Sequence, residues 1–273
     1  MIKKKINLVT YCISHKYYKY LDKLNINIIG SGAFYKEYPN FWLNDNVGKN
    51  ISKKNKNYGS LTSIYWIWKN HLKRFNSNDY ISICHYRRFW LKKKHDKIIN
   101  LKNLKKNILF KIPNKFKNYD CFVCKPQSVK GYKLSKLFKK GKRSLIDNPA
   151  IIYNKNLHTI NLHFNIFHIH NGLEESIKYL NKNDRDDFLK YVNTKTSFFP
   201  LSIFVMKKKF FNKLCFSTFE WLKKCEKLFN KKELNTYGQI RIFDFLAERY
   251  FSFWVTKYCN YKIWPYKLIN LKK

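Results

Sequence analysis

Acidic residues are scarce in this sequence, where 17 Asp and Glu face 56 Lys and Arg and the formal net charge is +39. Alanine occurs at only three positions, and arginine supplies only seven of the 56 basic residues. Scarce Ala and Arg beside abundant Lys, Asn, Ile, Tyr and Phe are typical of a coding sequence rich in A and T. Compositional bias therefore accounts for most of the lysine excess. Binding to nucleic acid or to an anionic membrane is the alternative interpretation of the charge.

Long apolar runs are also missing. No stretch reaches the ~18 uncharged apolar residues that a membrane-spanning helix needs, so none is predicted. Residues 1–10 lack the apolar core and cleavage site of a signal peptide, and we interpret them as leading into a first strand. Hydrophobic residues make up 45% of the chain and aromatic residues 18%. This content excludes a disordered polycation and predicts a sizeable core.

Patterns typical of metal sites are few. One C-x-x-C, at 121–124, falls in a predicted strand where its two cysteines point to opposite faces, and no second pair accompanies it. The scattered cysteines indicate buried free thiols and a reducing, cytoplasmic location. A lone Asp-x-Asp at 184–186 lies in a polar helical stretch. A group of histidines (158, 163, 168 and 170) lacks the spacing of a zinc site. We therefore predict no metal and no other cofactor.

Strands and helices alternate along the chain. Strands are predicted over 5–13, 26–29, 79–84, 119–124 and 201–206, and helices over 60–71, 162–180, 183–193, 208–229 and 236–257. This alternation predicts an α/β fold with a mixed, largely parallel sheet flanked by helices. Ligands bind beyond the carboxyl ends of such strands. Residues 85–88 follow one of these ends.

The most specific motif is the segment His85-Tyr-Arg-Arg-Phe-Trp90. Arginine recognises phosphate through a planar, bidentate fork. Two adjacent arginines at the end of a buried strand need an anion, because burying an unpaired charge is costly. A phosphate ligand is one such anion. The alternative is a salt bridge to an acid such as Asp45, Asp244 or Glu248.

Two segments before this strand are rich in polar and aromatic groups. The loop 45–55 combines one Asp with three Asn, one Ser and one Gly, which suits binding of sugar hydroxyls or a base edge. It is equally typical of an ordinary polar turn. In the following segment, 58–70, aromatic residues at 65, 66 and 68 cannot share one helix face. Some of these rings therefore join the core. The others either offer a stacking platform for a sugar or base, or pack in the core as well.

A fourth segment lies near the end of the chain. Arg241, Asp244 and Glu248 are spaced i, i+3 and i+7, so they line one face of a predicted helix, with Arg249 adjacent. A partly buried carboxylate beside arginines is suited to act as a catalytic base or to bind sugar hydroxyls. It can equally serve as the salt-bridge partner of those arginines.

In this order, the segments resemble a bacterial family known as a domain of unknown function, DUF4422. That family is associated with capsular and exopolysaccharide gene clusters, carries an HYRR motif and is regarded as glycosyltransferases. The match is carried by residues 45–55, Leu61-Thr62, 65–70, 85–89, 204–207 and 241–249. It implies a GT-A-like fold and transfer of a sugar, from UDP by expectation, to a growing surface polysaccharide or lipid-linked glycan. It further implies one domain over 1–273, with a nucleotide-sugar-binding half (1–125) and an acceptor-side half (126–273).

We hypothesise a metal-independent transfer on this basis. Arg87 and Arg88 would stabilise the departing nucleoside diphosphate, and Asp45 or Glu248 would deprotonate the acceptor hydroxyl or bind sugar hydroxyls. These four are the predicted catalytic residues. The predicted donor-binding residues are His85, Tyr86, Asn50, Ser52, Asn55, Thr62, Trp66, Arg241 and Arg249.

The sequence departs from the family at two carboxylates. Ser60 stands where the family has Glu before Leu-Thr, and Gly172 stands where it has Asp four residues after a histidine. An inactive relative that only binds sugar nucleotides is therefore one alternative, and a nucleic-acid-binding protein is another, although no nucleic-acid motif is present. We expect a cytoplasmic enzyme held by its lysines at the anionic inner face of the membrane.

Overall fold

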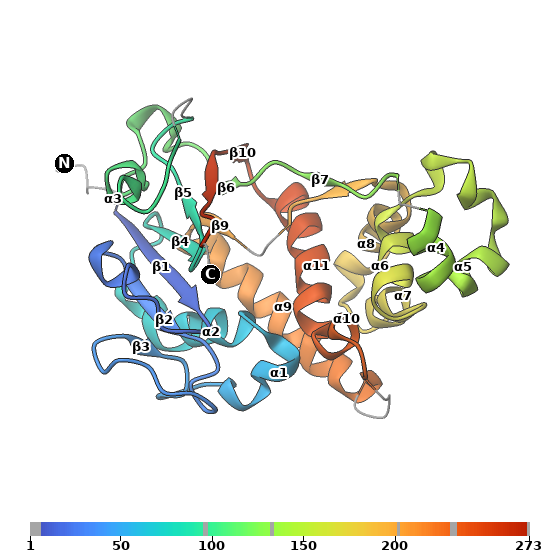
Figure 1. Cartoon of the computed structure of the whole chain (residues 1–273), viewed down its shortest axis with the longest axis horizontal. Helices are drawn as coiled ribbons and strands as arrows, with labels where there is room; N and C mark the ends of the chain where they lie inside the picture. Colours follow the sequence, from blue (N-terminus) through green and yellow to red (C-terminus); the bar gives the residue numbers. More distant parts are fainter. Residues whose placement is uncertain (1–6, 95–97, 132–133, 201–202, 230–233, 272–273) are drawn as a thin grey trace. The chain divides into compact units, whose positions relative to one another are not determined.

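The computed structural model describes residues 7–94, 98–131, 134–200, 203–229 and 234–271 (Figure 1). The chain divides into two units that are both discontinuous in sequence. Unit 1 comprises Met1–Lys125, Ser202–Cys215 and Val255–Lys273, and unit 2 comprises Pro126–Leu201 and Phe216–Trp254. The assignment of donor and acceptor roles to the halves 1–125 and 126–273 stays a prediction.

Unit 1 is built on a sheet of nine strands within the described residues, in the order β10-β6-β9-β4-β1-β2-β3, with β5 joined to β4 and β11 to β5. Its strands are β1 (Leu8–Ser14), β2 (Asn27–Gly30), β3 (Leu43–Asn44), β4 (Tyr80–His85), β5 (Arg88–Trp90), β6 (Cys121–Val123), β9 (Phe204–Lys207), β10 (Tyr261–Ile263) and β11 (Tyr266–Leu268). Strands β3, β2, β1 and β4 run parallel, whereas β9 is antiparallel to both neighbours. The predicted mixed, largely parallel sheet is therefore confirmed.

The central strands owe their place to composition. β1 and β4 are short runs of apolar and β-branched residues without polar alternation, which is typical of strands covered on both faces. Cys12 and Cys84 are register partners in the β1–β4 pair, and both thiols are almost completely buried. Of the predicted first strand, residues 5 and 6 lie outside the described part of the chain.

The main helical parts of unit 1 follow β3 and flank the sheet. They include α1 (Asn55–Tyr58), α2 (Leu61–Trp66), a π-helical turn (Ile67–His71), a 3-10 turn (Leu72–Arg74), α3 (Leu104–Asn107) and the start of α9 (Lys208–Phe229). The helix predicted over 60–71 is thus present, although its second half is π-helical. Leu61, Ile64 and Trp68 of its apolar stripe are buried.

Unit 2 is mainly helical. It contains α4 (Leu134–Lys140), α5 (Lys142–Asp147), α6 (Ile160–Phe167), α7 (Gly172–Ile177), α8 (Lys182–Thr194), α10 (Tyr237–Ile240), most of α9 and α11 (Ile242–Tyr258), and the antiparallel strand pair of β7 (Gln127–Ser128) and β8 (Ser197–Phe198). None of the helices in the described ranges is long and apolar enough to cross a bilayer.

Two predicted helices of unit 2 are each divided. The helix expected over 162–180 breaks between α6 and α7, where Asn171 is left-handed with φ 56°. A Cβ on Gly172 would lie 2.9 Å from a side-chain carbon of Ile169, so the chain packs tightly at this break. The helix expected over 236–257 breaks at Arg241, between α10 and α11. Apolar periodicity continues across both breaks, which is why the sequence did not reveal them.

Candidate active site

The parallel strands of unit 1 bring four chain segments to one edge of the sheet. Ser14 of β1 is the register partner of Gly30 of β2, and Gly30 is the partner of Asn44 of β3. His85 ends β4 beside Ile13 of β1. We call the residues at and just after these strand ends the carboxyl edge. Parallel α/β sheets bind their ligands at such an edge.

Asp45 is the centre of the hydrogen bonds at the carboxyl edge, and its side chain is completely buried. Its carboxylate accepts from the backbone N–H of Gly32 and Ala33, both at 2.9 Å. It also accepts from the hydroxyls of Ser52, Thr62 and Ser63, at 2.6, 2.6 and 3.3 Å. These bonds tie the loop after β2, the loop after β3 and helix α2 to one carboxylate. Hydrogen bonds to a buried charge are strong, so Asp45 fixes the shape of this edge.

The predicted donor-binding residues near Asp45 are engaged with the protein in the same way. Ser52 and Thr62 are fully buried. The Asn55 amide donates to Ser31 Oγ, the Gly59 carbonyl and Thr62 Oγ1 at 2.9–3.1 Å. The Trp66 indole is buried and donates to the Val47 carbonyl at 2.7 Å. All of these side chains hold the loops together.

Asn50 and Gly48 form a tight turn in the loop 45–55. The Asn50 amide is exposed and donates to the carbonyls of Asn46 and Gly48, at 2.9 Å each. Gly48 has φ +63°, and a Cβ there would lie 2.5 Å from Asn70 Oδ1, so glycine is required for this turn. The hydrogen-bonded turn is the ordinary structure that the sequence left open beside a ligand-binding loop.

Aromatic rings surround the end of β4. Tyr86 stacks on Tyr18 with ring centroids 5.0 Å apart and planes 1° apart, and His15 meets Tyr86 edge-on at 4.7 Å. The Tyr20 hydroxyl donates to the Tyr86 carbonyl. His85, Tyr86, Arg87 and Arg88 are all half-buried. The predicted HYRR motif therefore sits at the carboxyl edge, with Arg88 already in the antiparallel strand β5.

Arg87 differs from the other motif arginines in its surroundings. Among the described residues, no carboxylate lies within ion-pair distance of its guanidinium, whereas Arg241 and Arg249 each pair with one. Its contact there is with the Tyr86 ring, whose centroid is 5.7 Å from Cζ. At the end of β3, three strands from β4 in the sheet, Asn44 Oδ1 is also buried without a partner in the described part of the chain. The carboxyl edge thus holds one cation without a carboxylate partner and one amide oxygen without a hydrogen-bond donor.

The three acids named as salt-bridge partners for Arg87 and Arg88 have other neighbours. Asp45 is saturated by the bonds described above. Asp244 pairs with Arg241 at 2.9 Å, and Glu248 Oε2 lies 2.5 Å from Arg249 Nη1. Arg241 also donates to the Tyr237 hydroxyl at 3.1 Å. The structure therefore brings Arg241 to Asp244 and Arg249 to Glu248, all within unit 2.

Arg249 lies in an enclosed cluster of unit 2 and is only 1% exposed. Besides Glu248, its guanidinium contacts His163 Nδ1 at 3.2 Å and His168 Nε2 at 3.3 Å. The Phe198 ring lies over it, with Cζ 4.4 Å from the centroid. We call these residues the Arg249 cluster. Its members pair with the Nη groups of the arginine from within the protein, as a buried charge requires.

Both histidines of the Arg249 cluster are held neutral. Burial lowers the pKa of His163 to about 3, with the charge of Arg249 as the second cause. Burial, and then Arg249, also holds the pKa of His168 well below its usual range. A neutral imidazole has a lone pair that can accept a guanidinium N–H. Sequence reasoning noted these histidines but missed the cluster, because only the folded chain joins α6 to α11.

The other two histidines of the group, His158 and His170, have local partners. His158 bonds the Ile151 carbonyl at 2.8 Å, and His170 lies 3.3 Å from Asp147. Cys121 and Cys124 are buried free thiols. Within the described ranges, no three His, Cys, Asp or Glu side chains are grouped to hold a metal ion.

Unit 1 also has a hollow lined by lysines, with a volume of about 660 Å³. Lys49, Lys69, Lys73 and Lys208 line it together with Trp68, over whose ring the Lys69 ammonium lies at 3.4 Å. We call it the lysine hollow. It brings four lysines together on one part of unit 1.

The fold is that of a glycosyltransferase. The solved apo structure of WbbM, a bifunctional glycosyltransferase, matches 98% of this chain with a TM-score of 0.67 at 17% sequence identity. The chain covers 46% of that protein, so it spans about half the length of its structural neighbour. No curated protein matches the sequence significantly.

The sequence family is narrower than the fold. Residues 9–260 match the family described as a domain of unknown function, DUF4422. The chain therefore belongs to this family, as the ordered motifs had predicted.

Proposed function

We propose that this protein is a glycosyltransferase that moves a sugar from a nucleotide-sugar donor, UDP-linked by expectation, to a surface polysaccharide or lipid-linked glycan. The likeness in fold to a bifunctional glycosyltransferase and the carboxyl edge of unit 1 support this function. The observation that carries it is Arg87, a half-buried arginine at the end of β4 that faces no carboxylate among the described residues. A diphosphate is the anion that such a position suits best.

The reaction needs a group on the enzyme that stabilises the negative charge developing on the leaving diphosphate. The acceptor oxygen attacks the anomeric carbon, the bond from that carbon to the diphosphate oxygen breaks, and the nucleoside diphosphate leaves with the electron pair. We assign to Arg87, together with Arg88 and His85, the stabilisation of the charge that develops on the leaving group. Tyr86 and Tyr18 form the adjacent aromatic wall, and Asn44 Oδ1 accepts a donor hydroxyl.

Asp45 is better suited to positioning than to proton transfer. Its carboxylate already accepts five hydrogen bonds and is closed to solvent. We therefore propose that Asp45, with Ser52, Thr62, Asn55 and Trp66, shapes the donor site without touching the donor. The catalytic and donor-binding roles predicted from the sequence await mutagenesis.

Glu248 is the second predicted base. In the structure its carboxylate pairs with the enclosed Arg249. This contact favours a structural role for Glu248, Arg249 and Arg241 in unit 2. The proton of the acceptor hydroxyl still needs a base, and Glu248→Gln tests whether Glu248 supplies it.

The lysine hollow supports a second part of the proposal, which concerns location. Each lysine near an anionic bilayer contributes about 1 kcal/mol to membrane binding. We propose that Lys49, Lys69, Lys73 and Lys208 help to hold the enzyme at the cytoplasmic face of the membrane. Replacing Lys73 and Lys208 together by Ala should weaken binding to vesicles containing anionic lipid and leave binding to neutral vesicles unchanged.

Thermal shift and donor hydrolysis test the activity directly. The purified full chain should be stabilised by a nucleoside diphosphate and should release it from a matching nucleotide sugar, with and without EDTA. Metal-independent transfer predicts that EDTA leaves the rate unchanged. Stabilisation without turnover would indicate an inactive binder. Salt-sensitive binding of nucleic acid without any response to nucleotides would contradict the proposal.

A further inference from the structure

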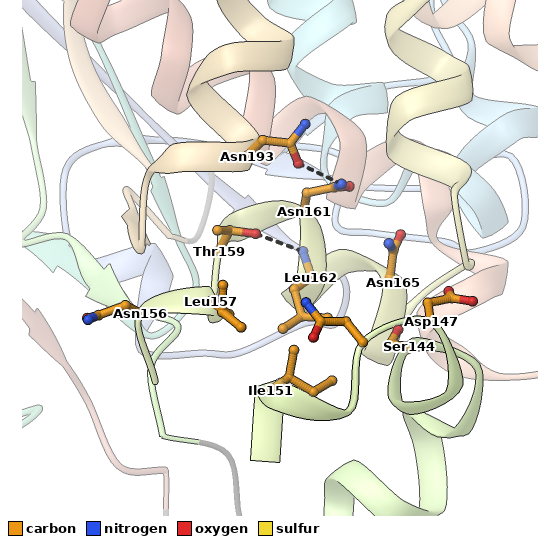
Figure 2. A pocket seen from close by; sticks show the side chains of 11 residues that line it. Ser144, Asp147, Ile151, Asn156, Leu157, Thr159, Asn161, Leu162, Asn165 and Asn193 are labelled. Atoms are coloured by element: carbon orange, nitrogen blue, oxygen red, sulfur yellow. Dashed lines mark hydrogen bonds between the residues drawn. The ribbon is translucent and has the colours of Figure 1, made fainter. Parts of the chain in front are cut away.

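A small hollow in unit 2 has a lining unlike the rest of the molecule (Figure 2). Its volume is about 270 Å³. Amide and hydroxyl side chains dominate the lining, with Asn148, Asn161, Asn165 and Asn193 beside Ser144 and Thr159. We call it the asparagine pocket. Amides and hydroxyls both donate and accept hydrogen bonds, and this matches the hydroxyl groups of a sugar.

The charge of the asparagine pocket excludes most anions. None of its lining residues is Lys or Arg, although the chain holds 56 of them. Its charged lining residue is Asp147, an acid whose carboxylate lies 3.3 Å from His170. A phosphate, a nucleotide or an acidic sugar would meet a carboxylate and no cation. The ligand that fits this lining is neutral.

Asn161 provides the observation that points to a ligand. Its side chain is 7% exposed, and its Nδ2 donates to Glu174 Oε1 at 2.7 Å and to Asn193 Oδ1 at 2.8 Å. These two bonds fix which amide atom is the oxygen. That Oδ1 is buried and has no hydrogen-bond partner among the described residues. Buried amide oxygens are nearly always bonded, so Asn161 presents an acceptor to a donor group from outside the chain.

The size and the apolar part of the lining define the ligand further. Small-molecule sites usually span about 300–1,000 Å³, so this pocket is at the small end and too small for a whole nucleotide sugar. Ile151, Leu157 and Leu162 supply an apolar surface for the C–H face of a ring. We propose that the asparagine pocket binds one neutral sugar ring of the glycan acceptor. The assignment of this ring to the acceptor rests on the glycosyltransferase function proposed above.

Binding of simple glycosides to the intact chain tests this inference. Methyl glycosides of glucose, galactose and mannose, and methyl glucuronide as the acidic counterpart, should be titrated by saturation-transfer NMR and calorimetry. At least one neutral glycoside should bind saturably, and the glucuronide should bind more weakly. Absence of saturable binding by any neutral glycoside, or a preference for the glucuronide, would overturn the proposal.

Two variants locate the binding in the pocket. Leu162→Trp fills it, and Asn193→Ala, at an exposed position, removes the amide that orients Asn161. Asn193→Ala should weaken glycoside binding by about three- to tenfold, the effect of one or two hydrogen bonds. Asn183→Ala, an exposed position on the same helix that does not line the pocket, is the matched control. Unchanged binding in a folded Asn193→Ala protein, or an equal loss in Asn183→Ala, would contradict the assignment.

Donor hydrolysis by the same protein separates the two proposals. If nucleotide-sugar hydrolysis is present but no neutral glycoside binds, the pocket assignment fails and the transferase function stands. If a glycoside binds at the asparagine pocket but no donor is bound or hydrolysed, the transferase function fails and the pocket remains a sugar site. In an active enzyme, Asn193→Ala should raise the KM for the acceptor, whereas Asn183→Ala should leave both that KM and donor hydrolysis without acceptor unchanged.

Discussion

Arg87 in unit 1 and Arg249 in unit 2 have the same charge but opposite surroundings. Arg87 is half-buried at the carboxyl edge and faces no carboxylate among the described residues. Arg249 is 1% exposed and contacts Glu248, His163 and His168. A guanidinium already satisfied by the protein stabilises the fold, whereas one without an internal anion is available to a ligand.

Loss of the Arg249 charge should have the largest effect. Arg249→Met removes the buried member of the pair and leaves the half-buried Glu248 without this arginine, and breaking a buried pair costs about 3–5 kcal/mol of unfolding free energy. Urea unfolding measures this loss, with the exposed Arg143→Ala as the control within about 0.5 kcal/mol of wild type. If Arg249→Met keeps wild-type stability but loses activity, Arg249 binds a ligand. That result would contradict the structural role that distinguishes Arg249 from Arg87.

Loss of Arg87 should instead act on activity. Arg87→Ala should lower kcat/KM for donor turnover by about 10²–10³, which is the effect of removing one group that stabilises developing charge. Its thermal stability should stay near that of wild type because no internal ion pair is lost. Arg74→Ala, an exposed arginine of the same unit, serves as the control. Full activity in Arg87→Ala would contradict the proposed donor site.

Asp45→Asn sharpens the comparison within unit 1. The new amide N–H₂ would face groups that donate to the carboxylate, and the loss of charge-assisted bonds should cost about 1.5–3 kcal/mol of stability. If Asp45 acts only by positioning, the pH profile of kcat should keep its shape while the KM for the donor rises. Loss of the acidic limb of that profile, where a catalytic base becomes protonated, without a change in stability would identify Asp45 as the base. Asp186→Asn, at an exposed position, is the control.

The pH dependence of stability offers a smaller but specific test of the Arg249 cluster. His163 and His168 have lowered pKa values when folded, His163 to about 3, against 6.5 when unfolded. Between these values the unfolded chain binds more protons, so stability is present above pH 6.5 and falls as the pH drops. The slope is at most about 1.4 kcal/mol per pH unit for each histidine. His163→Gln should flatten the slope in urea unfolding from pH 4 to 7, whereas His15→Gln should not.

Regular elements with strong local patterns were predictable from the sequence. The helix predicted over 208–229 has those bounds in the structure, and the strand predicted over 79–84 lies at Tyr80–His85. The strands β5, β10 and β11 were missed. Each has three residues, and β10 and β11 pair with strands more than 130 positions earlier in the chain. Such short segments are strands because a partner is present and not because of their own pattern.

The candidate site divides in the same manner. The placement of His85–Arg88 at the end of a buried strand followed from the sequence, since local hydrophobicity defines the strand and parallel strands share an edge. From the sequence alone, Asp45, Glu248 and the arginines were all predicted to be site residues, and no local pattern distinguished them. Their different environments depend on partners such as Gly32 and Thr62 for Asp45, which are separated from it along the chain.

The sequence by itself determined the α/β class, the main strands and the motifs that place the chain in its family. Apolar periodicity and strand composition are local properties, so they can be read from neighbouring residues. Tertiary structure alone decided which charges are satisfied internally, at Arg249, and which remain for a ligand, at Arg87. It also formed the asparagine pocket in a chain of net charge +39. The physical reason is that desolvation and hydrogen-bond satisfaction depend on all groups that pack around a side chain, wherever they lie in the sequence.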